Sequence, residues 1–266
     1  MGSMVLDATY SEIVGSRPAH FHDCHQLLYI RGGHAKITVQ GRHYLAEPGS
    51  AILISRFEEH AIEVSGDIYC RYALHISPTS HSLAALREEP YLSVLVNRPS
   101  QFRHVVSLRN REQAESLLDQ ILREQETQRP MYRKMQELLL QQLLLGLCRE
   151  HPELLAQQKD QIHLVQAIQA QFESDYAKPI SLVELAQQYH LSPSHISHLF
   201  KAVTGSSVMR YLTDCRLAAA KRYLAETDLE IGAIVEACGF SDNSNFSRMF
   251  RSVTGMSPTH FRRQYQ

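Results

Sequence analysis

The apolar residues of this chain change their spacing near Pro99, and this change constrains the fold more than any other feature of the sequence. From Ala19 to about Ser77 they alternate with polar residues or form short runs such as QLLYI, AKITV and SAILIS. These runs predict antiparallel strands, and RGGH, QGRH, EPGS and SGD predict the turns between them. Their number and spacing favour a sandwich or a small β-barrel, whose inner face could hold one small ligand.

After Pro99 the spacing becomes helical. Within NREQAESLLDQILREQETQ the apolar residues share one face and the charges lie opposite. The apolar face consists of Ala114, Leu117, Leu118, Ile121 and Leu122. A second helix, expected from about Met131 to Glu150, carries leucines on more than one face. This surplus suits either a roof over the β-domain or a contact in a homodimer, and both interpretations remain open.

A chain of 266 residues is too long for one ordinary hydrophobic core, so we expect two domains. The predicted boundaries are residues 1–155 and 162–266, with the polar segment 151–163 joining them. No apolar run approaches the about 18 residues that cross a bilayer. The first three residues look like a cloning remnant before a native start at Met4, and no secretory pattern follows. We therefore expect a cytoplasmic protein without a membrane partner.

The cysteine count and the charge distribution exclude few further classes of protein. Five cysteines without a C-x-x-C pair disfavour a disulfide framework and a structural zinc site. The formal net charge is −1, but the last 25 residues carry four arginines against the single acidic residue Asp242. Such a local basic cluster can contact phosphates without a basic overall composition.

The hexamer FKAVTG at 200–205 returns as FRSVTG at 250–255. Ser181 and Glu184 have the spacing of a capping box, and Ser192 followed by Pro193 predicts the start of the next helix. The first copy is therefore a helix-turn-helix unit at about 181–205. Two copies are too few for a solenoid, which generally needs three or more repeats.

The second helix-turn-helix unit is predicted at about 230–255. Asp228 or Glu230 starts its first helix, Gly239 takes the turn, and Ser241 or Asp242 caps its second helix. This copy has one more residue at its turn than the first. The segment 208–227 between the copies predicts a helix of nearly twenty residues, long enough to hold the two units about 30 Å apart.

The outward faces of the two closing helices carry short hydrogen-bonding side chains, followed one turn later by a cation. Side chains of these types suit a major groove, where base edges are read and phosphates are held. The predicted DNA-binding residues are Ser194, His195, Ser197, His198, Lys201, Asn243, Ser244, Asn245, Ser247, Arg248 and Arg251. A separation of about 34 Å would place the helices in successive turns of B-DNA.

The stretch IVEACGFSDNSNFSRMFRSVTGMSPTHFRR, 234–263, closely resembles the signature of AraC/XylS-type bacterial transcription regulators, and ISLVELAQQYHLSPSHISHLFKAVTG, 180–205, resembles that family's first helix-turn-helix. The resemblance implies an all-α domain that binds double-stranded promoter or operator DNA and acts together with RNA polymerase. It implies activation more often than repression. The family often has an arginine where this chain has His198, so we expect weaker or pH-sensitive base reading there.

The stretch HFHDCHQLLYIRGGHAKITVQGRHYLAEPGSAILISRFEEH resembles the cupin-like sensing domain that often precedes this DNA-binding half. His20, His22, Gln26 and His60 are spaced like the ligands of metal cupins. Gln26 replaces the expected carboxylate and is a poor ligand, so we expect no metal and no cofactor. We expect these four side chains to contact a small effector of unknown identity or to serve as polar core residues.

Two classes of function then compete. The first is an effector-responsive DNA-binding regulator, acting as an activator or, alternatively, as a repressor. The second is a metal-dependent cupin enzyme carrying a DNA-binding tail. No serine, cysteine or paired-carboxylate arrangement in the sequence supports catalysis. We therefore expect a regulator and not an enzyme.

Overall fold

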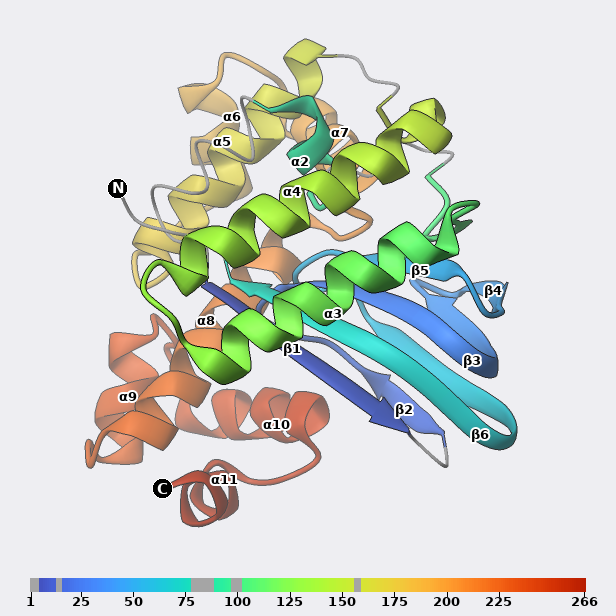
Figure 1. The fold of residues 1–266 in the computed structure, drawn as a ribbon. Coiled ribbons are helices and arrows are strands. Elements are labelled where there is room, and N and C mark those ends of the chain that lie inside the picture. The colour runs from blue at the N-terminus through green and yellow to red at the C-terminus, as the bar shows by residue number, and fades with distance from the viewer. Residues whose placement is uncertain (1–4, 13–15, 78–88, 97–101, 156–158) are drawn as a thin grey trace. The chain divides into compact units, whose positions relative to one another are not determined.

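The computed structural model describes residues 5–12, 16–77, 89–96, 102–155 and 159–266. The chain divides into two compact units, Met1–Gln158 and Lys159–Gln266, and each is described by itself. Sheet and helices make up the first unit, and helices alone make up the second (Figure 1). This confirms the expected fold class.

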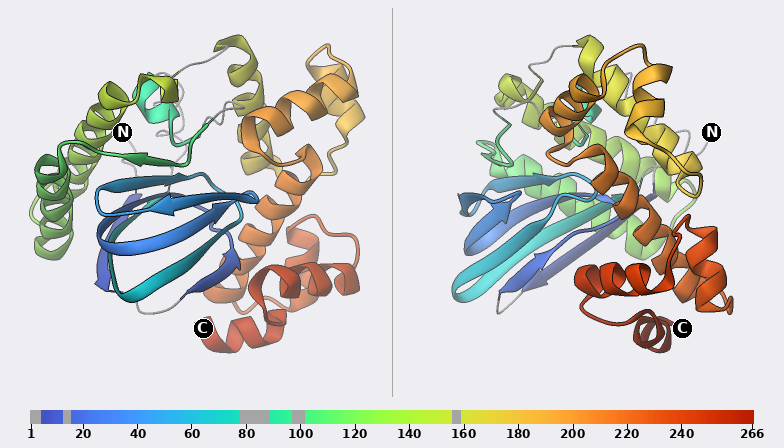
Figure 2. Two further views of the ribbon diagram at one scale, coloured as in Figure 1. Left: turned by 90° about the vertical axis from the view of Figure 1, so that its right-hand side faces the viewer. Right: turned by 180° about the vertical axis from the view of Figure 1, so that it is seen from behind.

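The first unit is built on one curled antiparallel sheet (Figure 2). Its main path is β1-β6-β3-β5-β7, while β2 pairs with β6 and β4 pairs with β3. The strands are β1 (Val5–Glu12), β2 (Arg17–His20), β3 (His25–Val39), β4 (Arg42–Ala46), β5 (Ser50–Ile54), β6 (His60–Ser77) and β7 (Val105–Ser107). The two long strands β3 and β6 pair along most of their length. β1 and β2 pair with β6, β4 and β5 pair with β3, and β7 pairs with β5.

Two of the predicted turns are wrong. RGGH lies inside β3 and SGD lies inside β6. The pairing of β3 with β6 shifts register on both sides of Gly32, so this glycine marks a bulge that bends the sheet and does not end the strand. β1 and β7 lie outside the stretch in which strands were predicted. β7 has only three residues, whereas β1 does alternate, with Leu6 and Ala8 buried, and this signal was overlooked.

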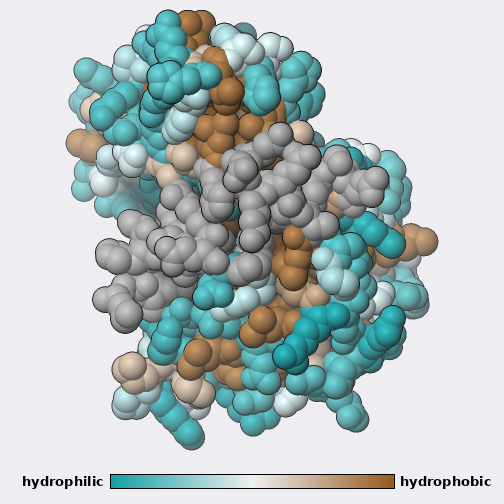
Figure 3. Space-filling model, turned by 90° about the horizontal axis from the view of Figure 1, so that it is seen from above, coloured by the Kyte–Doolittle hydropathy of each residue, from teal (hydrophilic) through white to brown (hydrophobic). Residues whose placement is uncertain are grey.

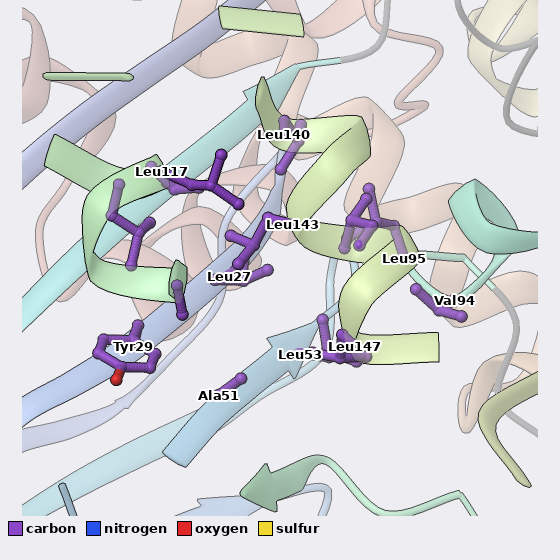
Figure 4. Packing of buried hydrophobic residues seen from close by; sticks show 14 of the residues in the cluster. Leu27, Tyr29, Ala51, Leu53, Val94, Leu95, Leu117, Leu140, Leu143 and Leu147 are labelled. Atoms are coloured by element: carbon purple, nitrogen blue, oxygen red, sulfur yellow. The ribbon is translucent and has the colours of Figure 1, made fainter. Parts of the chain in front are cut away.

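One face of the sheet is covered by helices α2 (Pro90–Ser93), α3 (Arg111–Thr127) and α4 (Tyr132–Glu150). Figure 4 shows Leu27, Tyr29 and Leu53 of the sheet packed against Leu117 of α3 and leucines of α4. The predicted apolar face of α3 is buried, apart from the partly buried Leu122. The leucines of α4 that roof the sheet are Leu139, Leu140, Leu143, Leu144 and Leu147.

The other face of the sheet encloses a second, inner cluster. Leu28 and Ile30 of β3 meet Ile52 and Ile54 of β5 and Ala73 of β6 there, and all five are buried. Alternate residues of each strand therefore serve the helix-covered face and the inner face in turn. The inner face is the one on which the sequence predicts a ligand.

The second unit consists of α5 (Lys159–Asp175), α6 (Leu182–Gln188), α7 (Pro193–Thr204), α8 (Val208–Glu226), α9 (Ile231–Ala237), α10 (Asn243–Thr254) and α11 (Pro258–Tyr265). Phe172, Phe200 and Tyr211 form the aromatic centre of its first half. Phe246 and Phe250 are fully buried in the centre of its second half. The short helix η1 (Pro152–Leu155) and the start of α5 lie within the segment 151–163, which was predicted to join the two domains.

The helix boundaries follow their caps. Ser181 and Glu184 form both bonds of the capping box, and Ser192 accepts from the backbone amide of His195. Of the alternatives in the second copy, Glu230 and Asp242 are the N-cap residues. α9 begins 49 residues after α6 (182 to 231) and α10 begins 50 residues after α7 (193 to 243), so the extra residue lies at the turn as predicted.

On the face drawn in Figure 3, hydrophilic side chains dominate and apolar ones form separate patches between them. Over the described ranges, every helix is too short or too polar to cross a bilayer.

Candidate nucleic-acid interface and effector site

The first candidate interface is the outer face of α7. Ile196, Leu199 and Phe200 anchor the helix in the core. Four of the predicted residues on the opposite side are exposed and Ser197 is half-buried. The exposed ones are Ser194, His195, His198 and Lys201. An open hollow beside the helix is lined in part by Ser194, His195 and His198. Their donors and acceptors are therefore available to a partner.

The second candidate interface is the outer face of α10. Phe246 and Phe250 are its buried residues. Asn243, Ser244, Asn245, Arg248 and Arg251 are exposed and Ser247 is half-buried. Both carboxylate oxygens of the N-cap residue Asp242 are used, one by the amide of Ser244 at 3.0 Å and the other by the amide of Asn245 at 2.8 Å. The first turn is thus held by its cap, and the side chains after it are free to contact a ligand.

The turn before each of these helices has the same backbone conformation. His190 has a φ of 55° and Gly239, at the matching place 49 residues later, has a φ of 76°. A Cβ on Gly239 would lie 2.5 Å from the carbonyl oxygen of Ala177. His190 shows that a side chain is tolerated in the left-handed conformation, so it is the close approach of the Ala177 backbone that makes glycine the residue that fits at 239.

One arginine of the basic cluster has a structural role. Arg262 lies on α11 and its Nη2 donates to the carbonyl oxygen of Leu229, which precedes α9. Arg263 is exposed, as are Arg248 and Arg251. The other three arginines of the cluster are exposed, and their contact with phosphate stays a prediction.

The predicted effector residues come together in the first unit. Side-chain nitrogens of His20, His22 and His60 all lie within 4.8 Å of one another, a geometry in which three imidazoles could hold a metal ion. The ring centroid of His22 is 5.0 Å from that of His60 and 5.7 Å from that of His75. Gln26 lies beside this group and not within it.

His60 is buried, and its tautomer follows from its one hydrogen bond. Nδ1 lies 2.9 Å from the carbonyl oxygen of Glu58, which can only accept, so Nδ1 carries the proton. Nε2 then presents a lone pair and has no hydrogen-bond partner. Burial lowers the pKa of His60 to about 4, which keeps the ring neutral at physiological pH.

Gln26 is held by a residue that the sequence analysis did not single out. Its amide nitrogen lies 2.8 Å from Nε2 of His75, the residue opposite it on β6. Arg71 and Tyr69 lie on the same strand at alternate positions and are also buried. Tyr69, Arg71 and His75 all belong to the run IYCRYALHI. Their alternation with apolar residues in that run was the sequence signal that could have identified them.

Comparisons with known proteins agree with both halves. The family description of the AraC-like ligand binding domain matches residues 6–144, and that of a helix-turn-helix domain matches residues 185–264. The HTH-type transcriptional activator RhaS of Escherichia fergusonii is 28% identical over 250 residues, which cover 93% of this chain and 88% of that protein. The uncharacterized HTH-type transcriptional regulator YijO of Escherichia coli K12 is 37% identical over 102 residues, only 38% of this chain and 36% of that protein.

The fold is also that of ToxT from Vibrio cholerae. The structure of ToxT with an unsaturated fatty acid bound has a TM-score of 0.62 and 13% identity, covering 98% of this chain and 95% of that one. ToxT bound to (E)-4-(8-methylnaphthalen-1-yl)but-3-enoic acid has a TM-score of 0.64 and 12% identity, covering 100% of both chains. The chain belongs to the AraC-type family of helix-turn-helix transcription regulators, with an AraC-like ligand-binding domain ahead of its DNA-binding helices.

Proposed function

We propose that this chain binds promoter or operator DNA in the cytoplasm by placing α7 and α10 in the major groove. The observation that carries the proposal is the shared design of the two helices, each with a capped first turn, a buried aromatic side and an exposed side of hydrogen-bonding groups and cations. Short polar groups at the helix start would read base edges, and Lys201 and Arg251 would contact phosphates. These roles are predictions for the eleven residues named above.

The test is selection of genomic fragments by the purified full chain, followed by a mobility-shift titration of the fragment that is enriched. We expect a site with two short conserved blocks, separated by about one turn of B-DNA. Variants that alter α7 and α10 separately should each lose recognition of one block. Enrichment no better than that of random fragments would contradict the proposal.

We further propose that the regulator activates transcription together with RNA polymerase. The support is that RhaS, the relative that matches 93% of this chain, is a transcriptional activator. A reporter driven by the enriched promoter should rise when the chain is expressed with its effector. A fall in the same reporter would assign a repressor instead.

The inner face of the first unit is the proposed effector site, with His20, His22, Gln26 and His60 among its contacts. ToxT structures contain an unsaturated fatty acid or a naphthalenyl butenoic acid, which supports a small organic ligand for this chain as well. Binding would alter the regulator through a difference in affinity between its conformations. A small-molecule screen by thermal shift, followed by mobility shift with each hit, tests this role.

We propose a second copy of this chain as the partner of α4. The N-cap residue Met131 and, on the helix, Met135, Leu138 and Leu145 are exposed, 74%, 44%, 47% and 43% respectively. Their spacings of four, three and seven residues fit a two-helix seam, which would be self-complementary. Replacement of both Leu138 and Leu145 by lysine should convert a dimer into a monomer in light scattering, whereas a monomeric wild type would contradict the proposal.

The competing function is a metal-dependent cupin enzyme, and the three clustered imidazoles are the observation that favours it. The relatives that match are transcription regulators, which favours the regulator. Metal analysis of the purified chain separates the two proposals. Stoichiometric iron, manganese or zinc together with turnover of a substrate would support the enzyme.

A further inference from the structure

Five polar side chains of β3 and β6 each have a buried atom without a hydrogen-bond partner in the described part of the chain. The atoms are Oε1 of Gln26, Nε2 of His60, the hydroxyl of Tyr69, Nε of Arg71 and Nδ1 of His75. Four of these residues are at least nine-tenths buried, and His75 is partly buried. Buried polar groups are almost always paired, so five unpaired ones on two neighbouring strands require an explanation.

These groups face a common space. Tyr69 and Ala73 belong to the inner cluster, so Arg71 and His75, at alternate positions of the same strand, point to the inner face as well. Gln26 lies opposite His75 in the register, and Ile30 lies opposite Arg71. Burial lowers the pKa of both His60 and His75, and the positive charge of Arg71 lowers both further.

Arg71 carries a buried positive charge that no carboxylate of the described residues balances. Its guanidinium carbon lies 5.9 Å from the ring centroid of Tyr69, whose hydroxyl interacts with it but is neutral, and Arg17, which also acts on it, is positive. Burial lowers the pKa of Arg71, but a guanidinium stays protonated in proteins. A buried charge without a counter-ion is strongly unfavourable, so an anion that pairs with Arg71 would be bound favourably here.

The five groups also divide by their hydrogen-bonding character. The Gln26 amide donates to Nε2 of His75, so the proton of that neutral ring lies on Nδ1. Arg71, His75 and Tyr69 therefore offer three donors, while His60 and Gln26 offer two acceptors. Three donors around one cation suit a carboxylate, and two acceptors suit the hydroxyl groups of the same molecule.

We propose that the effector of this chain is a hydroxy carboxylic acid, with its carboxylate on Arg71 and a hydroxyl on His60 or Gln26. One buried guanidinium matches the single charge of a carboxylate better than the nearly two charges of a phosphate monoester. This inference rests on the proposed role of the inner face as the effector site. It goes further by naming the chemical class that the site selects.

The test uses the full-length chain with isotope-labelled arginine and follows the Nε–H resonance of Arg71 by NMR. Sodium glycolate, sodium acetate, glycolamide and sodium phosphate are added at constant ionic strength, with sodium chloride as the balancing salt. Glycolate should shift the resonance, acetate should bind about tenfold more weakly because one hydrogen bond is missing, and glycolamide should have no effect.

Two variants identify the resonance and test the charge. Arg71→Gln and Arg71→Met should lack the resonance, which assigns it to Arg71. Both should unfold at no lower temperature than the wild type, because each removes an unbalanced charge, but glycolate should raise the unfolding temperature of the wild type alone. Arg31→Gln is the matched control. It removes a guanidinium from the opposite face of the same sheet, where Arg31 pairs with Glu115, and should keep the response.

Several results would overturn the inference. They are thermal stabilisation by glycolate that survives in both Arg71 variants, equal binding of glycolamide, a response to phosphate alone, no response of Arg71 to any probe, or marked destabilisation by both substitutions. Operator binding without added acid is measured on the same preparations. If the wild type does not bind the operator, the proposed function is contradicted. If it binds the operator but Arg71 fails these tests, only the inference about the effector is contradicted.

Discussion

The guanidinium of Arg248 donates a hydrogen bond of 3.0 Å to Oδ1 of Asn245, one turn earlier on the exposed face of α10. The amide of Asn245 is in turn bound by the cap residue Asp242. Arg248 is therefore held in one orientation before any DNA arrives. An arginine presented in this way has less conformational freedom to lose when it pairs with a base.

We expect Arg248→Ala to relax base preference and to cost about 1–3 kcal/mol at the cognate site, because a bidentate contact with a base edge would be lost. Asn245→Ala should give a smaller loss with the same pattern, since it removes the group that orients Arg248. The measurement is a mobility-shift titration against the cognate site and single-base variants of it. Unchanged discrimination in Arg248→Ala would remove this residue from the interface.

Arg251→Ala should behave differently. This residue is exposed in the last turn of α10 and lies beyond the part of the helix that would meet base edges. A phosphate contact is indifferent to sequence, so we expect similar weakening on all DNA and a salt slope that falls by about one. Binding constants measured over a series of salt concentrations test this. A change confined to one base position would instead assign base reading to Arg251.

Gly239→Ala should destabilise the second unit more than Gly255→Ala. Both glycines have a φ of 76°, so alanine suffers similar backbone strain at either position, on the order of 1–3 kcal/mol. Only at Gly239 would the new Cβ meet backbone atoms, those of Ala177, whereas nothing lies within 4 Å at Gly255. Denaturant unfolding of the two variants isolates the effect of the contact. Equal losses would show that the backbone around Ala177 moves to accommodate the methyl group.

The sequence predicts the second unit better than the first, for a physical reason. Helix ends depend on residues three apart, so Ser181 with Glu184, or Ser192 with Pro193, locates a boundary without tertiary information. Strand ends depend on partners far along the chain. Glycines inside β3 and β6 could mark a turn or a bulge, and only the pairing of Ile30 with Arg71 on one side of Gly32 and of His34 with Ser65 on the other decides for a bulge.

The same distinction applies to the effector site. His20 and His22 are recognisable from their spacing, and His60 from its resemblance to a late cupin histidine. Arg71 and His75 form no local motif, and their importance arises because β6 places them beside Gln26 and His60. Whether a charged side chain such as that of Arg71 has a partner can be judged only from the three-dimensional structure around it.

The buried histidines predict a loss of stability in mild acid. Burial lowers the pKa of His60 from an ordinary 6.5 to about 4, so between these values the unfolded chain binds more protons than the folded one. The free energy of unfolding should therefore fall as the pH drops from 6.5 towards 4, by on the order of 3 kcal/mol from His60. The lowered pKa of His75 acts in the same direction.

Denaturant titrations of the first unit's transition in the full chain, carried out between neutral pH and pH 4, measure this effect, and His60→Gln isolates it. The variant lacks the imidazole that stays neutral in the folded state and takes up a proton on unfolding. Its free energy of unfolding should therefore fall less steeply than that of the wild type as the pH is lowered. His43→Gln is the matched control, because His43 is exposed on β4 and shares a hydrogen bond with Thr38. Parallel curves for the wild type and His60→Gln would mean that the inner face admits enough water to solvate a protonated His60, which would also weaken the case that Arg71 is an unbalanced charge.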